Sequence, residues 1–285
     1  MKTFFKTRIA PTPSGFLHLG NALSFWITEA LATKHNARLL LRIDDMDRER
    51  VDSAYIDDIF ETLDFLDIQW DEGPRNPMDF EANYSQVHRM DLYRRALEKL
   101  VDSGKVYACT CSRKQIENKF GGRYPGTCRF KKIPLDTRGA AWRIDTEAAA
   151  DVLVKNHEGL ATQMPFPDVM NHFVVQKKDG FPAYQLTSLI DDLHFGVDLI
   201  VRGADLWPST LAQLFLAGCL GESRFMEVVF YHHKLLCLPD GTKLSKSAGA
   251  TSIRYLRQSG NSRQDLLTKL GLLLDKPVNA PTDLV

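Results

Sequence analysis

The first 66 residues alternate between short apolar runs and longer stretches with helical spacing, and this alternation restricts the possible folds more than any other feature. Residues 4–9 form a short strand-like run that ends at the turn-forming sequence PTPSG, and residues 38–43, RLLLRI, form a compact apolar run. Apolar residues recur at helical spacing over residues 20–35 and again over 53–66. The order strand, helix, strand, helix is typical of an α/β fold with a parallel sheet.

The middle of the chain departs from this pattern. From residue 105 to about residue 180 it is rich in Cys, Gly and Pro and contains short extended runs such as AWRID. These features indicate an inserted, partly antiparallel subdomain. A predicted helix at 184–193, a strand at 197–202 and a helix at 209–219 then resume the α/β pattern. The predicted division is a first half of the α/β domain at 1–104, an insert at 105–183, a second half at 184–250 and a short helical tail at 251–285.

The composition favours a folded protein that stays in water. With 44% hydrophobic and 25% charged residues, this chain of 285 residues can bury a full core, which excludes a disordered or fibrous protein. No apolar run approaches the ~20 residues needed to cross a bilayer. The N-terminal residues lack the apolar stretch of a signal peptide. Five cysteines, mostly far apart, do not make a disulfide framework, so we expect a cytoplasmic protein with reduced thiols and no membrane contact.

The charges balance overall but are segregated along the chain. Lysine and arginine number 36, as do aspartate and glutamate. Residues 44–81 contain 14 acidic and 3 basic residues, whereas residues 105–132 contain 8 basic and 1 acidic residue. This pattern predicts either two solvated faces of opposite sign or a basic arm that meets the phosphates of a nucleic acid.

The motif HLGN, residues 18–21, follows PTPSG directly and opens a predicted helix. Helix N-termini bind anions through free backbone N–H groups, and ligands of open parallel sheets lie at the carboxyl ends of the strands. Gly15 and Gly20 allow a close backbone approach, and His18 can donate to a phosphate oxygen. Taken alone, such a motif is more often a turn and a helix cap.

A second motif, KLSKS at residues 243–247, lies in a loop with Gly and Ser residues. Lys243 and Lys246 can place two ammonium groups on a triphosphate. Taken alone, the motif is more simply an exposed basic loop.

Together, these two motifs resemble the signatures of class I aminoacyl-tRNA synthetases. PTPSG, RIDDMDRE and VRGADL narrow the resemblance to the glutamyl/glutaminyl branch, and the five motifs extend over nearly the whole chain. The resemblance implies a Rossmann-like parallel sheet split by the inserted subdomain, and it implies ATP with Mg²⁺. It assigns ATP binding to His18, Gly20, Asn21, Lys243 and Lys246, of which His18, Lys243 and Lys246 are the expected catalytic residues.

Charged residues at the ends of three predicted strands point to one edge of the sheet. These residues are Arg8, Asp44 and Arg202. Two guanidinium groups suit a dicarboxylic amino acid, although each could instead pair with a nearby carboxylate, such as that of Asp45 or Asp205. By the resemblance, glutamate is bound at Arg8, Thr12, Asp44, Tyr184 and Arg202.

Two of these positions depart from the usual family pattern. Asp44 stands where the family usually has Glu, and the shorter side chain leaves selectivity between aspartate and glutamate open. Thr12 replaces a common Ser but keeps the hydroxyl.

Three cysteines lie in the basic insert. Cys109, Cys111 and Cys128 supply three thiolates, enough to hold Zn²⁺ if there is a fourth ligand. No histidine lies between residues 88 and 157, so a local fourth ligand is Tyr124 or water. The resembled family includes members with a Cys-x-Cys…Tyr-x-x-x-Cys site, which implies structural zinc at Cys109, Cys111, Tyr124 and Cys128. The alternative is reduced core cysteines, which is what we expect of Cys219 and Cys237.

After Ser247 only 38 residues remain, too few for the anticodon-binding domains of a full glutamyl-tRNA synthetase. The chain therefore resembles the truncated glutamyl-Q tRNA(Asp) synthetases. This resemblance implies a monomer that activates glutamate with ATP without tRNA. The glutamate would then be transferred to the queuosine base of the tRNA(Asp) anticodon loop. The alternatives are a minimal glutamyl-tRNA synthetase that charges a 3′ end, an adenylate-forming ligase with a small acceptor, and a non-catalytic RNA-binding module.

Overall fold

A computed structural model describes residues 3–236 and 252–285 of the chain. The chain divides into two compact units. The first unit consists of Met1–His88, Val197–Asp205 and Phe230–Val285, and the second of Arg89–Gly196 and Leu206–Val229. The predicted sites at Lys243 and Lys246 and the predicted core position of Cys237 lie outside the described residues.

The first unit is built on a parallel sheet. The strands β1 (Lys6–Ile9) and β2 (Arg38–Leu41) pair in parallel, from Lys6 opposite Arg38 to Ile9 opposite Leu41. β8 (Leu199–Gly203) pairs in parallel with the other side of β1, and β9 (Val229–His233) follows β8 in the strand order. The α/β pattern predicted for the N-terminal part is thus confirmed, although β1 begins two residues later and β2 ends two residues earlier than the sequence predicts.

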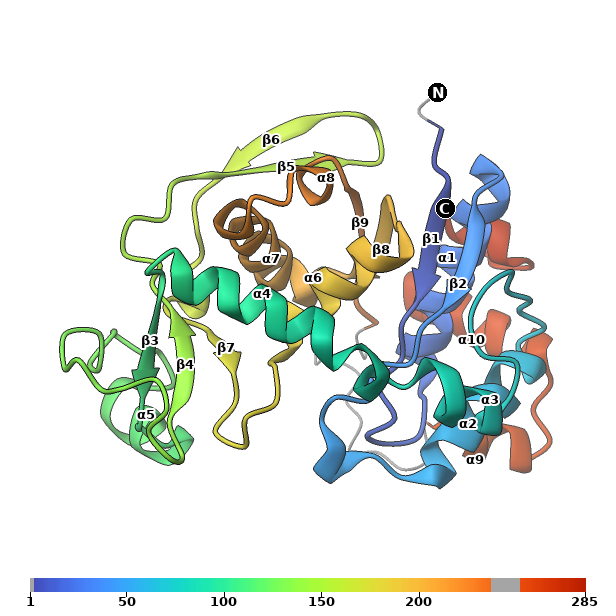
Figure 1. Ribbon diagram of the computed structural model, residues 1–285. Helices are drawn as coiled ribbons and strands as arrows, with labels where there is room; N and C mark the ends of the chain where they lie inside the picture. Colours follow the sequence, from blue (N-terminus) through green and yellow to red (C-terminus); the bar gives the residue numbers. More distant parts are fainter. Residues whose placement is uncertain (1–2, 237–251) are drawn as a thin grey trace. The chain divides into compact units, whose positions relative to one another are not determined.

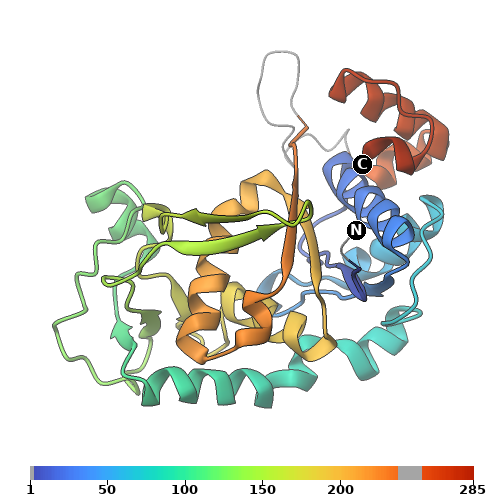
Figure 2. The ribbon, with the colours of Figure 1, turned by 90° about the horizontal axis from the view of Figure 1, so that it is seen from above.

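Helix α1 (Leu19–His35) connects β1 to β2 and forms the centre of this unit's core. It is buried over most of its surface, with Trp26 completely buried, because it contacts β1 and β2 as well as the C-terminal segment (Figures 1 and 2). The C-terminal segment contains α9 (Ile253–Gln258), α10 (Arg263–Leu274) and the short helix η7 (Pro281–Leu284). The weakly helical tail predicted from the sequence therefore folds and covers apolar surface of α1.

The remaining helices of the first unit are short, apart from α2 (Ser53–Phe65), which begins at the capping residue Asp52. They are η1 (Arg48–Arg50), α3 (Pro77–Asp79), the π-helical turn η2 (Phe80–Tyr84), η3 (Gln86–Arg89) and η5 (Ala204–Leu206).

The second unit contains antiparallel pairs, as predicted for the middle of the chain. The strands β3 (Val106–Cys109), β4 (Ala141–Ile144) and β7 (Val174–Gln176) form a three-stranded sheet in that order. β5 (Val152–Asn156) and β6 (Ala161–Met164) form a hairpin.

Both helices that were predicted after the insert are present in the second unit, and both are longer than predicted. The predicted helix at 184–193 is α6 (Tyr184–Phe195), and the one at 209–219 is α7 (Trp207–Leu220). The others are α4 (Met90–Asp102), α5 (Arg113–Phe120), η4 (Asp168–Met170) and α8 (Ser223–Met226). Within residues 3–236 and 252–285, no helix is both long and apolar enough to cross a membrane.

Candidate functional site

His18 is the N-terminal cap of α1. Its Nδ1 accepts a hydrogen bond from the backbone N–H of Gly20 at 3.1 Å, and Asn21 Oδ1 accepts one from the backbone N–H of His18 at 3.0 Å. A Cβ atom at Gly20 would lie 3.0 Å from the His18 ring, so a side chain at this position would require the ring to shift. Because Nδ1 acts as an acceptor, a neutral His18 carries its proton on Nε2, and this nitrogen is then a donor. The cap and the predicted phosphate donor are therefore compatible roles for one side chain.

The structure brings four predicted glutamate-binding residues to one edge of the first unit. Because β1, β2 and β8 are parallel, their carboxyl ends lie at the same edge of the sheet. The Asp44 N–H donates to the carbonyl of Pro11, the neighbour of Thr12, at 2.9 Å. Arg8 Nη1 donates to the carbonyl of Val201, the neighbour of Arg202, at 3.1 Å.

The charged residues at this edge are buried. Arg8 is 5% exposed, Asp44 is 6% exposed and Arg202 is 3% exposed. Charges buried to this extent require compensation by the protein or by a ligand.

Arg42 compensates Asp44, a role that the sequence analysis missed. Arg42 Nε lies 2.7 Å from Asp44 Oδ1, and Nη2 lies 2.9 Å from Oδ2. The available signal was the spacing of two residues, which places both side chains on the same side of an extended chain. Each carboxylate oxygen of Asp44 can accept a second hydrogen bond, so an ammonium group remains a possible further partner.

Asp45 anchors a different segment. Its carboxylate accepts hydrogen bonds from Ser85 Oγ at 2.6 Å and from the backbone N–H of Gln86 at 2.7 Å, and it forms an ion pair with Arg48. Asp45 is fully buried. Its role is thus to fix the chain after β2 against residues 85–86.

Aromatic and imidazole groups of β9 lie beside Arg202. The Arg202 guanidinium carbon is 5.0 Å from the centre of the Phe230 ring, and His232 stacks on that ring with centroids 6.1 Å apart. Burial, assisted by the charges of Arg202 and His233, lowers the pKa of His232 to about 3. His232 is therefore uncharged at neutral pH. Neither Phe230 nor His232 was predicted as a site residue, although two adjacent histidines at the end of an apolar run were a visible signal.

Three other predicted glutamate- or ATP-binding residues lie in the second unit or outside the described residues. Tyr184 begins α6 in the second unit and is 41% exposed. Lys243 and Lys246 lie outside the described residues. Their joint action with Arg8 and Arg202 stays a prediction.

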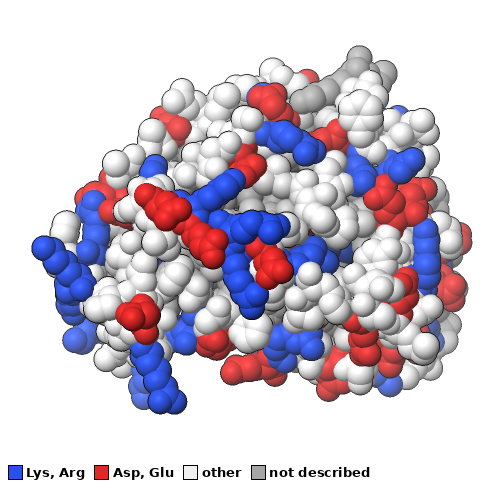
Figure 3. Space-filling model, in the orientation of Figure 1, with Lys and Arg blue, Asp and Glu red and all other residues white. Residues whose placement is uncertain are grey.

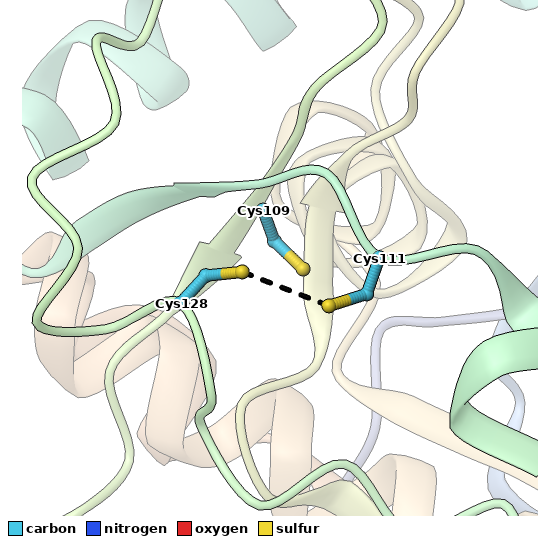
Figure 4. Close-up of side chains that lie close together, drawn as sticks. All are labelled: Cys109, Cys111 and Cys128. Carbon is cyan, nitrogen blue, oxygen red and sulfur yellow. Dashed lines mark hydrogen bonds between the residues drawn. The ribbon is translucent and has the colours of Figure 1, made fainter. Parts of the chain in front are cut away.

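The three cysteines of the second unit converge, as Figure 4 shows. Cys109 ends β3, Cys111 follows it, and Cys128 lies in the loop after α5; their sulfur atoms lie within 4.8 Å of one another. The sulfur atoms of Cys111 and Cys128 are 3.6 Å apart, and Cys109 Sγ is 3.3 Å from Tyr124 Oη. Four such ligands around one zinc ion would be separated by about 3.5 to 3.8 Å. The donor set therefore fits a tetrahedral metal.

Hydrogen bonding distinguishes the ionisable groups of this cluster. Burial raises the pKa of Cys128, but hydrogen bonds from Tyr124 and from the Thr110 backbone outweigh burial and hold the pKa below its ordinary value. Burial and the neighbouring thiols raise the pKa of Cys111. Burial and the contact with Cys109 raise that of Tyr124. Cys128 is thus better prepared to ionise than Cys111, and a bound cation would favour the thiolate form of a ligand.

His172 supports the loop that carries Cys128. It is buried, and its ring meets that of Tyr124 edge-on with centroids 6.3 Å apart. A Cβ atom at Gly126 would lie 2.8 Å from His172 Nε2, so this close approach requires glycine. Within the described parts of the chain, the cysteines alone form a group of three potential metal ligands. His172 therefore packs behind the cluster rather than joining it.

A basic surface covers α5 and the loop that follows it. Six exposed cations belong to this surface: Arg113, Lys114, Lys119, Arg123, Lys131 and Lys132. Phe130 is 80% exposed among them, and the guanidinium carbon of Arg129 lies 4.9 Å from its ring centre. Basic side chains are also visible on the left side of the face in Figure 3. This combination of cations and an exposed aromatic ring suits single-stranded nucleic acid.

Comparisons with known proteins agree with this arrangement. A family model described as tRNA synthetases class I (E and Q), catalytic domain, matches residues 5–131 and 140–280. Glutamate--tRNA ligase 2 of Syntrophus aciditrophicus is 32% identical over 94% of this chain, which spans 57% of that protein. The chain thus spans little more than half the length of this curated relative.

Other relatives match over more of their length. Two proteins named glutamyl-Q tRNA(Asp) synthetase, from Dechloromonas aromatica and Symbiobacterium thermophilum, are 33% and 35% identical over 89% and 95% of this chain. The matches cover 82% and 87% of those proteins. The solved glutamate-tRNA synthetase of Elizabethkingia anophelis shares the fold, with a TM-score of 0.69 at 23% identity over 90% of this chain and 54% of its own. The chain belongs to the class I tRNA synthetases of the glutamate and glutamine branch.

Proposed function

We propose that this protein activates glutamate with ATP and transfers it to the queuosine base in the anticodon loop of tRNA(Asp). One observation carries this choice: two proteins named glutamyl-Q tRNA(Asp) synthetase match along 82% and 87% of their length. A specific observation also favours a second function, the charging of a tRNA 3′ end, because relatives named glutamate--tRNA ligase match at similar identity.

The edge of the sheet in the first unit is the proposed glutamate site. Arg8 and Arg202 would each pair with one carboxylate of the amino acid, because a guanidinium group binds a carboxylate through two hydrogen bonds. Asp44, oriented by Arg42, would accept a hydrogen bond from the ammonium group of glutamate. Thr12 and Tyr184 would complete the contacts. Because Arg42 already balances the charge of Asp44, Arg8 and Arg202 supply one further positive charge for each carboxylate of the amino acid.

Activation of glutamate is an in-line displacement. An oxygen of the α-carboxylate attacks the α-phosphorus of ATP, and pyrophosphate leaves with the electron pair of the broken bond. His18, the N-terminus of α1 near Gly20 and Asn21, and the lysines Lys243 and Lys246 stabilise negative charge on the phosphates. Mg²⁺ accompanies ATP. A hydroxyl of the queuosine base then attacks the activated carbonyl carbon, and AMP leaves.

The cysteine cluster has a structural role in this proposal. Cys109, Cys111, Tyr124 and Cys128 would hold Zn²⁺, whose bonds replace a hydrophobic core in a small insert. The separations among these four groups support this role. We assign residues 105–183 to the inserted subdomain, flanked by the two halves of the catalytic domain at 1–104 and 184–250 and followed by the tail at 251–285.

The decisive experiment measures transfer of labelled glutamate to tRNA from cells that make queuosine and from cells that do not. We expect label on the queuosine-containing tRNA alone. Removal of the 3′-terminal adenosine should leave this labelling unchanged, because the acceptor lies in the anticodon loop. Equal labelling of both tRNA pools, abolished by that removal, would establish 3′ charging instead.

A second experiment tests the role of the lysine motif. Replacement of Lys246 by Ala should slow glutamate-dependent ATP–pyrophosphate exchange by a factor on the order of a hundred or more, because a charge that stabilises the transition state is lost. Unchanged exchange would contradict the role of Lys246 and leave the other assignments to be judged by tRNA transfer.

A further inference from the structure

Asp58, a residue to which no role has been assigned above, is a buried carboxylate beside the start of α1. It lies on α2 and is 1% exposed. Its Oδ2 accepts a hydrogen bond from the backbone N–H of Leu17 at 3.2 Å. Its Oδ1 lies 3.7 Å from Arg257 Nη2 on α9. Asp58 therefore contacts the residue directly before His18 and also a helix of the C-terminal segment.

Further contacts hold the same short segment from both sides. The Phe16 ring meets the Tyr55 ring of α2 edge-on, with centroids 4.9 Å apart, and the guanidinium carbon of Arg254 lies 4.6 Å from the Phe16 ring centre. The backbone N–H of Ile253 donates to the Leu17 carbonyl at 2.8 Å. Residues 16–18 are thus fixed between α2 and α9.

A buried carboxylate is an expensive way to fill this space. Asp58 Oδ1 and Arg257 Nη1 are buried, and neither has a hydrogen-bond partner within the described residues. The Arg257 side chain is 22% exposed, so Asp58 is the buried member of the pair. A buried carboxylate with such incomplete bonding contributes little to stability compared with an apolar side chain of similar volume. What Asp58 does provide is direction, because its hydrogen bond to Leu17 fixes the backbone at one point. Arg257, which is itself hydrogen-bonded to Glu61, adds a charge 3.7 Å from the carboxylate.

We propose that Asp58 is a positioning residue, whose carboxylate holds the backbone at Leu17 so that His18 and the N-terminus of α1 meet the phosphates of ATP. The inference rests on the proposed function, since it concerns how that site is oriented. Asp58 acts through Leu17 and touches no substrate. Loss of the carboxylate should therefore weaken the binding of ATP and leave the binding of glutamate at Arg8 and Arg202 unchanged.

Three variants test this role in glutamate-dependent ATP–pyrophosphate exchange. Replacement of Asp58 by Ala should raise the KM for ATP by about tenfold, the usual cost of a lost hydrogen bond to a charged group. Asp58→Asn keeps an acceptor for the Leu17 N–H and should recover part of this loss. Asp57→Asn is the matched control, because Asp57 is the exposed neighbour of Asp58 on α2. The KM for glutamate should stay constant in all three variants.

A purely structural role would give a different result. If Asp58→Ala lowers the maximal rate in proportion to the folded fraction, with the KM for ATP unchanged, the proposal is wrong. Equal increases in both KM values would also overturn it, because they would indicate a general distortion of the first unit.

Hydrogen exchange of the unliganded protein separates this proposal from the proposed function. The Leu17 and Gly20 amides should exchange faster in Asp58→Ala than in the wild type and in Asp57→Asn. If the wild type shows no exchange of ATP with pyrophosphate, the proposed function fails, and this measurement still decides whether Asp58 positions the segment. Unchanged protection of residues 16–21 in folded Asp58→Ala would refute the positioning role.

Discussion

The strand-end site of the first unit and the cysteine cluster of the second unit hold their polar groups in different ways. At the strand ends, protein donors engage the carboxylates: Asp44 binds Arg42, and Asp45 binds Ser85 and Gln86. In the cysteine cluster, three thiols and a phenol meet each other. Thiols are weak donors and weak acceptors, so hydrogen bonds among them stabilise the cluster little. We therefore expect the first site to keep its geometry without a ligand, whereas the proposed zinc ion would hold the second.

Removal of a thiol from the cysteine cluster has the largest expected effect. Structural zinc sites bind with roughly 10 to 16 kcal/mol of apparent free energy, much of which is folding free energy. Cys128→Ser should therefore abolish stoichiometric zinc binding and open the segment around residues 105–132 to proteolysis. Elemental analysis and limited proteolysis measure these two effects.

Cys219→Ser is the control for this experiment. Cys219 lies alone on α7, and burial raises the pKa of its thiol. This variant should bind zinc as the wild type does. If Cys128→Ser retains zinc and resists protease as well as the wild type does, the proposed difference between the strand-end site and the cysteine cluster is wrong.

Removal of the Arg42 guanidinium tests whether the protein itself compensates the buried charge of the strand-end site. Arg42→Ala leaves the buried Asp44 carboxylate without its bidentate partner, which should lower the free energy of unfolding by about 3 to 5 kcal/mol. Chemical denaturation measures this change. Arg38→Ala, four residues earlier at the start of β2 and with a side chain 71% exposed, should cost about 1 kcal/mol or less.

A double variant sharpens the result. Replacement of both Arg42 and Asp44 by Ala should restore part of the stability that Arg42→Ala loses, since no uncompensated charge then stays buried. Equal stability of Arg42→Ala and Arg38→Ala would show that the strand-end site, too, lacks compensation by the protein.

The features of the first unit that could be predicted from sequence are local. The helical spacing of α1 and its capping residues lie within a few positions of each other, and the start of the helix differed by one residue from the prediction. The convergence of the cysteines could also be predicted, because C-x-C keeps two thiols close together in the chain and Cys128 follows only 17 residues after Cys111.

The features that could not be predicted involve partners far apart in the chain. In the second unit, Asp191 on α6 accepts hydrogen bonds from Arg89 at 2.8 Å and from Tyr93 at 2.6 Å, across 102 and 98 residues. Charged residues in a helical stretch of sequence predict a solvated face of the helix. The neighbouring residues in the sequence do not indicate that such a charge has a buried partner. His172 was missed near the cysteines for the same reason, as it lies 44 residues beyond Cys128.

The basic surface of the second unit provides a smaller test of the comparison. The exposed Phe130 can stack on a base, which is worth about 1 to 3 kcal/mol in single-stranded nucleic acids. Phe130→Ala should therefore weaken binding of queuosine-containing tRNA(Asp) about tenfold, with zinc content unchanged. Phe5→Ala removes a ring that is 76% exposed in the first unit and serves as the control. Equal binding by the two variants would contradict a role of Phe130 in RNA recognition.

Glu29 provides the smallest expected effect and tests the first unit away from its site. It lies half-buried on α1, and burial, partly offset by Arg263 and increased by Asp67, raises its pKa to about 7. Unlike Asp44, it thus ionises at a cost that the protein does not fully compensate. A carboxyl group whose pKa is higher in the folded than in the unfolded state stabilises the protein at low pH. This contribution is lost as the pH rises from about 4.5 towards and through 7.

Glu29→Gln carries no charge at any pH and should remove this dependence. Relative to the wild type, the variant should gain on the order of 1 kcal/mol of stability between pH 5 and pH 8, a figure reduced for the solvent that reaches the group. Urea unfolding at several pH values measures the difference, with the exposed Glu49→Gln as control. If the stability difference between Glu29→Gln and the wild type does not change with pH, Arg263 compensates Glu29 as fully as Arg42 compensates Asp44. The first unit would then contain no uncompensated carboxyl group at this position, and the contrast with the cysteine cluster would be stronger.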